Sequence, residues 1–305
     1  MAVGPETEVI RAVPVRHWGR LVSAALILLV VAWLVQAAIG SDFVDFTVVR
    51  RYLFNDLILE GLRNTIIISV LAQGAGIVLG TVFAVMRLSS NPVVSLSSSF
   101  YIWFFRGTPV LVQLLFWFNG VPGVFKNLTI AVPFTDITLY STPMVAFMTP
   151  FMAAFLGLAL NEGAYMAEIV RAGILSVDEG QADAAHALGM TPAKTMRRIV
   201  LPQAMRVIIP PTGNEFISML KTSSLASVVL YGELLRRAGD IYNRNLAVIE
   251  LLIVASFWYL VLTSIASVGQ YYLERRFARG RARALPETPL QRIRRNLSAG
   301  RSRRV

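Results

Sequence analysis

Three polar side chains recur at helical spacing within an otherwise apolar stretch at about residues 207–232. Glu215, Ser218 and Thr222 stand at positions i, i+3 and i+7, which places them on one face of an α-helix, with Thr222 about 20° from Glu215 around the axis. A carboxylate beside two hydroxyls can bind a positively charged group through charge-assisted hydrogen bonds. Charged side chains at bilayer depth are costly and usually mark a pathway for a substrate or an ion. We therefore expect this face to contact a polar substrate.

The same segment allows other interpretations. Glu215 could instead pair with a cation on a neighbouring helix and hold a helix bundle together. Ser218 and Lys221 have the Ser-x-x-Lys spacing of a hydrolase dyad with lysine as the base, although no convincing oxyanion donors accompany them. Lys221 lies about 120° from Glu215 around the helix, so the two are not a helix-face ion pair. Pro210 and Pro211 precede the face and could leave backbone carbonyls free for a ligand.

The elements that position these residues follow from the composition. Hydrophobic residues make up 55% of the 305 and charged residues 15%, against about 25% charged residues in soluble domains. A helix needs roughly 20 apolar residues to cross a bilayer. Windows of this kind occur at 21–41, 64–86, 107–125, 137–161, about 207–232 and 251–273. We therefore expect an all-α membrane protein with about six spans.

The basic residues predict the orientation of the chain in the membrane. Three arginines precede the first window, and residues 171–206 carry five basic side chains, whereas residues 121–136 carry only Lys126. Lysine and arginine gather on the cytoplasmic side, so both termini are expected inside and residues 121–136 outside. We expect the first window to remain as a helix rather than to be cleaved as a signal peptide.

The net charge of +11 is concentrated at the C-terminus. Residues 274–305 contain eleven arginines and two glutamates, which predicts a cytoplasmic anchor to anionic lipid headgroups rather than a nucleic-acid site. The chain has no cysteine and only two histidines, far apart in the sequence. We therefore expect no thiol catalysis, no metal site and no cofactor.

The loop between the fourth and fifth windows has the pattern of two short helices. Ser176 followed by Glu179 fits a capping box that begins a helix. Gly189 can end that helix in the left-handed conformation. Thr191-Pro192 is a typical start for the next helix, with Thr as the N-cap and Pro in the first turn, and Pro202 is expected to mark a break. The predicted coupling loop covers about 176–202.

Within this loop, residues 183–191 resemble a DNA-binding helix-turn-helix, but such a unit needs a free domain to reach a major groove. A more specific resemblance is to the permease subunits of ATP-binding-cassette importers. Their pattern is Glu-Ala-Ala, three residues, Gly, nine residues, and then Ile-x-Leu-Pro. The matching residues here are Asp183-Ala184-Ala185, Gly189 and Ile199-Val200-Leu201-Pro202. The departure is Asp183 in place of Glu.

The resemblance implies that these residues couple the chain to an ATPase. In the family, the first helix of the loop fits a groove on the cytoplasmic ATPase subunit and transmits its closure to the membrane helices. The coupling residues would then be Asp183, Ala184, Ala185, Gly189, Leu201 and Pro202. A phosphate-binding loop of the form G-x-x-x-x-G-K-[ST] does not occur in the sequence, so the chain is not expected to be an enzyme, and ATP hydrolysis is expected on a separate subunit.

Four further segments resemble the polar amino acid branch, the histidine/glutamine/arginine type, over about residues 55–278. They are Gly61-Leu62 with Thr65 and Ser69, Arg106-Gly107-Thr108-Pro109, Asn161–Tyr165 with Glu168 and Arg171, and Pro210–Leu225. The resemblance implies substrate contacts by Asn214, Glu215, Ser218, Thr222, Asn161 and Tyr165. In this family an acid commonly follows the lysine, but here Thr222 stands there. A substrate ammonium would then meet one carboxylate, which argues against a dibasic amino acid.

The predicted organisation is an added N-terminal part, residues 1–54 with the first span, a five-helix permease core over 55–278, and a basic cytoplasmic tail over 279–305. The resemblance implies one half of a dimeric, alternating-access pore in the cell membrane. The implied partners are an ATPase subunit, an extracytoplasmic amino-acid-binding protein, a second permease chain of the same or a related kind, and membrane lipid. The alternative is a secondary transporter or channel for a small polar solute.

Overall fold

The computed structural model describes residues 18–40, 44–132, 135 and 138–277. The chain divides into two compact units, Met1–Val48 and Val49–Val305. In the first unit, α1 (Trp18–Ile39) is an apolar helix over the first predicted window. The short helix α2 (Phe46–Tyr52) follows. The predicted coupling residues all lie within the described part, whereas the arginine-rich segment 279–305 lies outside it.

Two long helices of the second unit match predicted windows. Helix α3 (Asp56–Arg87) and helix α13 (Val248–Phe277) are long and apolar enough to cross a membrane by themselves. A bent pair follows α3: α4 (Pro92–Gly107) and the helical run Val110–Val124 meet at 102° and count together as a further candidate span. The run consists of α5 (Val110–Leu115), the π-helical turn η1 (Phe116–Gly120) and α6 (Val121–Val124).

The fourth and fifth predicted windows are wrong in their boundaries. The first part of window 137–161 contains β2 (Thr138–Pro143) and α7 (Met144–Phe147), and helix α8 covers Pro150–Leu175 instead. In place of one helix over the fifth window, about 207–232, the structure has α11 (Leu201–Thr222) followed by the 3-10 helix η3 (Ser223–Val229). Charged residues do not end these helices: α8 continues past Glu162 to Leu175, and α11 contains Glu215 and Lys221. The mostly helical permease fold is confirmed, and the total of about six spans stays a prediction.

The structure adds a hairpin that the apolar pattern hid. Strand β1 (Asn127–Ala131) pairs antiparallel with β2, and Ile130 lies opposite Tyr140. The predicted outer segment 121–136 therefore includes a strand, and its partner strand comes from the predicted fourth span. Thr138, Tyr140 and Thr142 alternate along β2, and β-branched and aromatic residues of this kind favour extended pairing.

Capping side chains begin most of the helices that build the core. Each capping side chain accepts a hydrogen bond from a backbone N–H of the first turn, which would otherwise have no partner. The caps are Asn55 for α3, Asn91 for α4, Thr149 for α8 and Glu233 for α12 (Leu234–Asn245). Pro92 and Pro150 stand in the first turns of α4 and α8, where a missing N–H costs nothing.

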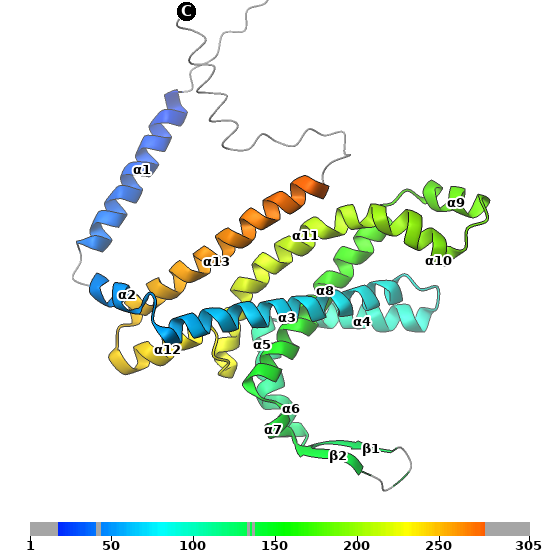
Figure 1. Cartoon of the computed structure of the whole chain (residues 1–305), viewed down its shortest axis with the longest axis horizontal. Coiled ribbons are helices and arrows are strands. Elements are labelled where there is room, and N and C mark those ends of the chain that lie inside the picture. The colour runs from blue at the N-terminus through cyan, green and yellow to red at the C-terminus, as the bar shows by residue number, and fades with distance from the viewer. Residues whose placement is uncertain (1–17, 41–43, 133–134, 136–137, 278–305) are drawn as a thin grey trace, which may run out of the picture. The chain divides into compact units, whose positions relative to one another are not determined.

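Helices α3 and α8 form the most extensive contact in the described part of the chain, and α11 packs against both (Figure 1). Close approach depends on glycines of α3. A Cβ atom on Gly80 would lie 2.4 Å from Met166 Cβ and 2.8 Å from the Ala167 nitrogen. Small residues let membrane helices approach closely and gain van der Waals contact. This packing fixes the position of α8 and therefore of its polar side chains.

The loop between α8 and α11 folds as two helices, with corrections to their ends. Helix α9 covers Glu179–Ala187, and α10 (Pro192–Thr195) leads through the π-helical turn η2 (Met196–Val200) into α11. The capping box at Ser176 is wrong: Asp178 caps α9 by accepting from Gly180 N at 2.9 Å. Ser176 Oγ instead donates to Gly173 O of α8 at 2.7 Å. Pro202 does not break the helix, because it falls in the first turn after the wider η2.

Candidate functional site

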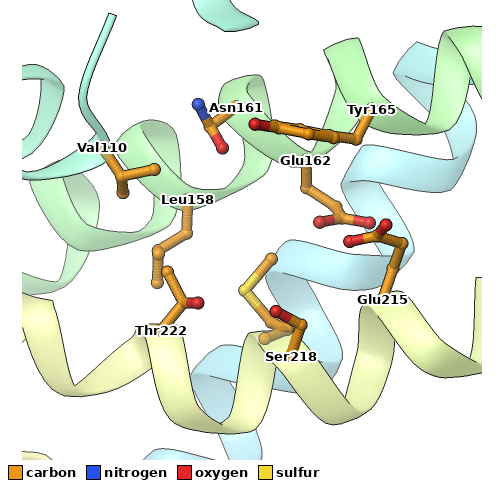
Figure 2. A pocket seen from close by; sticks show the side chains of 9 residues that line it. Val110, Leu158, Asn161, Glu162, Tyr165, Glu215, Ser218 and Thr222 are labelled. Carbon is orange, nitrogen blue, oxygen red and sulfur yellow. The ribbon is translucent and has the colours of Figure 1, made fainter.

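A cavity of about 350 Å³ lies where α5, α8 and α11 meet (Figure 2). Helix α8 and helix α11 supply most of its wall, and α5 closes it with one residue. The lining residues are Val110 from α5, Leu158, Asn161, Glu162 and Tyr165 from α8, and Glu215, Ser218, Met219 and Thr222 from α11. Its size suits a small polar molecule.

The predicted polar face of α11 lines this cavity. Glu215, Ser218 and Thr222 all border it, as expected for positions i, i+3 and i+7 of one helix. Lys221 is exposed and is not a lining residue, which agrees with its predicted place on another side of the helix. Asn214 is not brought into the cavity, because its Nδ2 lies 3.5 Å from the Glu274 carboxylate of α13.

The two residues predicted from α8 also border the cavity. Asn161 is buried, and its Nδ2 donates to the Phe105 carbonyl at 2.8 Å. Tyr165, one turn later, is partly exposed and presents its ring to the cavity. Because Asn161 holds the last turn of α4, it ties that helix end to the cavity wall.

Glu162 was missed as a site residue. It is buried, borders the cavity and accepts a hydrogen bond from Gln73 Nε2 of α3 at 3.0 Å. Figure 2 shows the Glu162 and Glu215 side chains turned toward one another. The expectation of a single carboxylate is therefore wrong: the second comes from α8 rather than from the position of Thr222. A charge that ends an apolar window was the available signal.

The support behind Glu162 comes from one face of α3. Gly76 leaves room for the carboxylate side chain, since a Cβ there would lie 2.5 Å from Glu162 Cγ. Gln73, one turn earlier, supplies the hydrogen bond, and its own Oε1 is buried without a partner in the described structure. Ser69 Oγ, a further turn away, is buried in the same condition. Helix α3 thus positions the Glu162 carboxylate, which belongs to α8.

Two backbone carbonyls near the double proline, those of Pro210 and Ile208, accept side-chain hydrogen bonds. Gln270 Nε2 of α13 donates to Pro210 O at 2.7 Å. Thr212 Oγ1 donates to Ile208 O at 2.8 Å. The prolines themselves remove the N–H partners of the carbonyls four residues earlier, those of Arg206 and Val207. Among the described residues, no cluster of three or more histidine, aspartate or glutamate side chains could hold a metal ion.

The predicted coupling residues lie on α9, in the turn that follows it and at the start of α11, and all but one of them are exposed. Asp183, Ala184 and Gly189 are exposed, while Ala185 is buried against the rest of the loop. Leu201 and Pro202 are exposed at the first turn of α11. Gly189 has φ +76°, the left-handed conformation predicted for it. Leu188, just before it, is 84% exposed, which leaves an apolar side chain available to a partner.

Known proteins resemble this chain in sequence and in fold. Residues 76–279 match the family described as binding-protein-dependent transport system inner membrane component. The arginine transport system permease protein ArgU of Corynebacterium glutamicum is 48% identical over 277 residues, covering 90% of this chain and 85% of that protein. The L-cystine transport system permease protein TcyB of Bacillus subtilis is 39% identical, covering 72% and 86%.

A solved structure supports the same assignment. The crystal structure of an amino acid ABC transporter with histidines matches with a TM-score of 0.65 and 38% identity. The match covers 76% of this chain and 99% of the solved one.

Proposed function

Because the chain belongs to the family of inner membrane components of binding-protein-dependent transport systems, and is the permease component of an amino acid ABC importer, we propose that it carries a cationic amino acid of the arginine type. The observation that supports this most directly is the pair of carboxylates, Glu162 and Glu215, at one cavity. None of the nine described lining residues is basic.

The charges of the cavity match a dibasic amino acid better than a neutral one. Such a substrate carries an ammonium group and a second cation on its side chain, so each cation can meet one carboxylate. A neutral amino acid would leave one of two facing carboxylates without a positive partner, which is unfavourable in a poorly solvated site. The 48% identity to a protein named as an arginine transport permease supports the same substrate class.

Transport requires that the cavity respond to ATP on another subunit. Helices α10, η2 and α11 follow one another without a gap from Pro192 to Thr222. Helix α9 contacts α10 and η2, so a displacement of α9 by an ATPase would reach this helical run through those contacts and pass along it to Glu215. We propose that α9 docks on a cytoplasmic ATPase, and that a second permease chain and an extracytoplasmic binding protein complete the importer. Because the chain belongs to this importer family, the alternative of a secondary transporter or channel is no longer needed.

The orientation can be tested in cells. Both termini are proposed to be cytoplasmic, with residues 121–136 outside. The chain has no cysteine, so single cysteines at positions 128 and 290 report on each side with an impermeant maleimide. We expect labelling of intact cells at position 128 alone. Labelling at 290 without labelling at 128 would reverse the orientation.

Direct binding tests the substrate class. The permease is purified with its ATPase, and labelled arginine is displaced by arginine or by citrulline, its neutral isostere. A charged hydrogen bond contributes about 1.5–3 kcal/mol, so Glu162→Gln and Glu215→Gln should each weaken arginine binding roughly 10- to 100-fold. Glu168→Gln is the matched control, because Glu168 is on α8 but pairs with Arg171 at 2.7 Å and does not line the cavity. Equal displacement by citrulline would refute a cationic substrate.

A further inference from the structure

Arg106 lies next to the cavity without lining it. Its guanidinium is centred 5.1 Å from the Tyr165 ring, and Tyr165 is a lining residue. Within the described part of the chain, Arg106 forms no salt bridge, and its side chain is exposed. A cation is thus held beside an acidic cavity by an aromatic ring rather than by a carboxylate.

The backbone around Arg106 is fastened to the cavity wall. The carbonyl of Phe105 accepts from Asn161 Nδ2 at 2.8 Å and from Gln113 Nε2 at 2.9 Å. Gln113 Nε2 also donates to Thr108 O at 3.1 Å and to Thr108 Oγ1 at 2.8 Å. Val110, just after the bend, lines the cavity. These bonds fix the end of α4, so the backbone of Arg106 is held at a defined position beside the cavity.

The charges of an amino acid substrate leave one group without a partner inside the cavity. Glu162 and Glu215 match the two cations of a dibasic amino acid, but the α-carboxylate needs a positive partner, and no lining residue supplies one. Arginine is well suited to this task, because its planar fork of N–H donors binds a carboxylate bidentately while its face rests on an aromatic ring.

We propose that Arg106 binds the α-carboxylate of the substrate at the mouth of this cavity and so makes the site select amino acids over amines. The proposal rests on the proposed function, a cationic amino acid held by Glu162 and Glu215. Arg106 then acts as a specificity determinant, and the Tyr165 ring holds it ready. The Arg106-Gly107-Thr108-Pro109 segment has in this way a role beyond bending the chain.

The test compares arginine with agmatine, which has the same guanidinium and an amine but no carboxylate. Binding of both is measured to the purified permease–ATPase complex of the wild type and of Arg106→Gln, Arg106→Lys and Arg87→Gln. Arg87 is the matched control, since it is an exposed arginine at the end of α3 and is not in contact with the cavity.

Arg106→Gln should weaken arginine binding about 10- to 100-fold, the range expected for losing a charge-assisted pair. Agmatine binding should stay unchanged or become tighter, because a positive charge beside a cationic ligand has been removed. Retained agmatine binding also reports an intact cavity. The arginine affinity of Arg106→Lys should lie between those of the wild type and Arg106→Gln. The affinities of Arg87→Gln should match those of the wild type.

Two results would overturn the inference. One is an unchanged ratio of arginine to agmatine affinity in Arg106→Gln. The other is tighter binding of both ligands, which would make Arg106 only a repulsive charge. If the wild type instead binds citrulline as well as arginine, the proposed function fails, and the inference fails with it. If arginine is preferred over citrulline but the ratio to agmatine does not change, the inference alone is wrong.

Discussion

The coupling loop and the cavity differ in the separation along the chain of the residues that build them. In the loop, Asp178 caps α9 through Gly180, and Gly189 N and Met190 N donate to the carbonyls of His186 and Ala185. These bonds join residues at most five positions apart and complete a Schellman motif.

In the cavity, the bonds that position side chains join distant residues. Asn161 reaches Phe105, 56 positions away, and Gln73 reaches Glu162, 89 positions away. The surface that we propose docks on an ATPase is thus specified by local turns. A site that must surround a small molecule depends on how three helices pack.

The largest expected effect tests whether the cavity depends on a distant helix. Gln73→Leu removes the hydrogen-bond donor to the buried Glu162 carboxylate. This loss should lower the free energy of unfolding by about 1.5–3 kcal/mol. Arginine affinity of the purified complex should fall, together with its Tm. Ser69→Ala, on the same face of α3, removes a hydroxyl with no partner in the described structure, and should leave both nearly unchanged. Equal effects of the two variants would contradict the support assigned to Gln73.

The next effect concerns the close approach of α3 and α8. Gly80→Ala would place a Cβ 2.4 Å from Met166 Cβ and 2.8 Å from the backbone of Ala167. Overpacking of this kind costs about 1–3 kcal/mol. Gly74 is on the same helix and has nothing within 4 Å, so Gly74→Ala should be neutral or stabilising by up to about 1 kcal/mol. Thermal unfolding in detergent measures both, and a Gly80→Ala variant as stable as Gly74→Ala would contradict this packing.

A smaller effect on stability is expected in the loop, with a large effect on transport. Gly189 has φ +76° and open space around it, so Gly189→Val is opposed by backbone strain of about 1–2 kcal/mol rather than by a clash. We expect the variant to insert but to lose transport and substrate-stimulated ATP hydrolysis, because α9 is aimed wrongly. Gly189→Asn should retain activity, since Asn tolerates the left-handed conformation. Normal uptake by Gly189→Val would remove the coupling role of this turn.

The smallest effect distinguishes the observed cap from the predicted one. Asp178→Ala should destabilise α9 by about 1 kcal/mol, because Gly180 N loses its acceptor. Ser176→Ala removes only the bond to Gly173 O of α8 and should change α9 less. Amide hydrogen exchange over Glu179–Ala187 is the measurement. Greater exchange in Ser176→Ala than in Asp178→Ala would instead support the predicted capping box at Ser176.

Local signals predicted much of the fold and part of the site. The apolar windows at 64–86 and 251–273 lie within α3 and α13. Gly189 and Thr191-Pro192 predicted the turn and the start of the next helix. The spacing of Glu215, Ser218 and Thr222 predicted a common face of α11, and all three line the cavity. Each of these signals acts within a few residues, where helix geometry and backbone strain depend only on neighbouring positions.

Tertiary structure decided which further groups join that face. Glu162 ends an apolar window in the sequence, yet α8 continues through it, because Gly76 leaves it space and Gln73 gives it a hydrogen bond. Asn214 is next to Glu215 in sequence but lies beside Glu274 of α13. Arg106 reaches Tyr165 because bonds from α5 and α8 hold the end of α4. Helical periodicity specifies one face of one helix. The charged residues that face it across the cavity belong to other helices. Their position depends on close packing between segments far apart in the sequence, and a local sequence pattern carries no information on that packing.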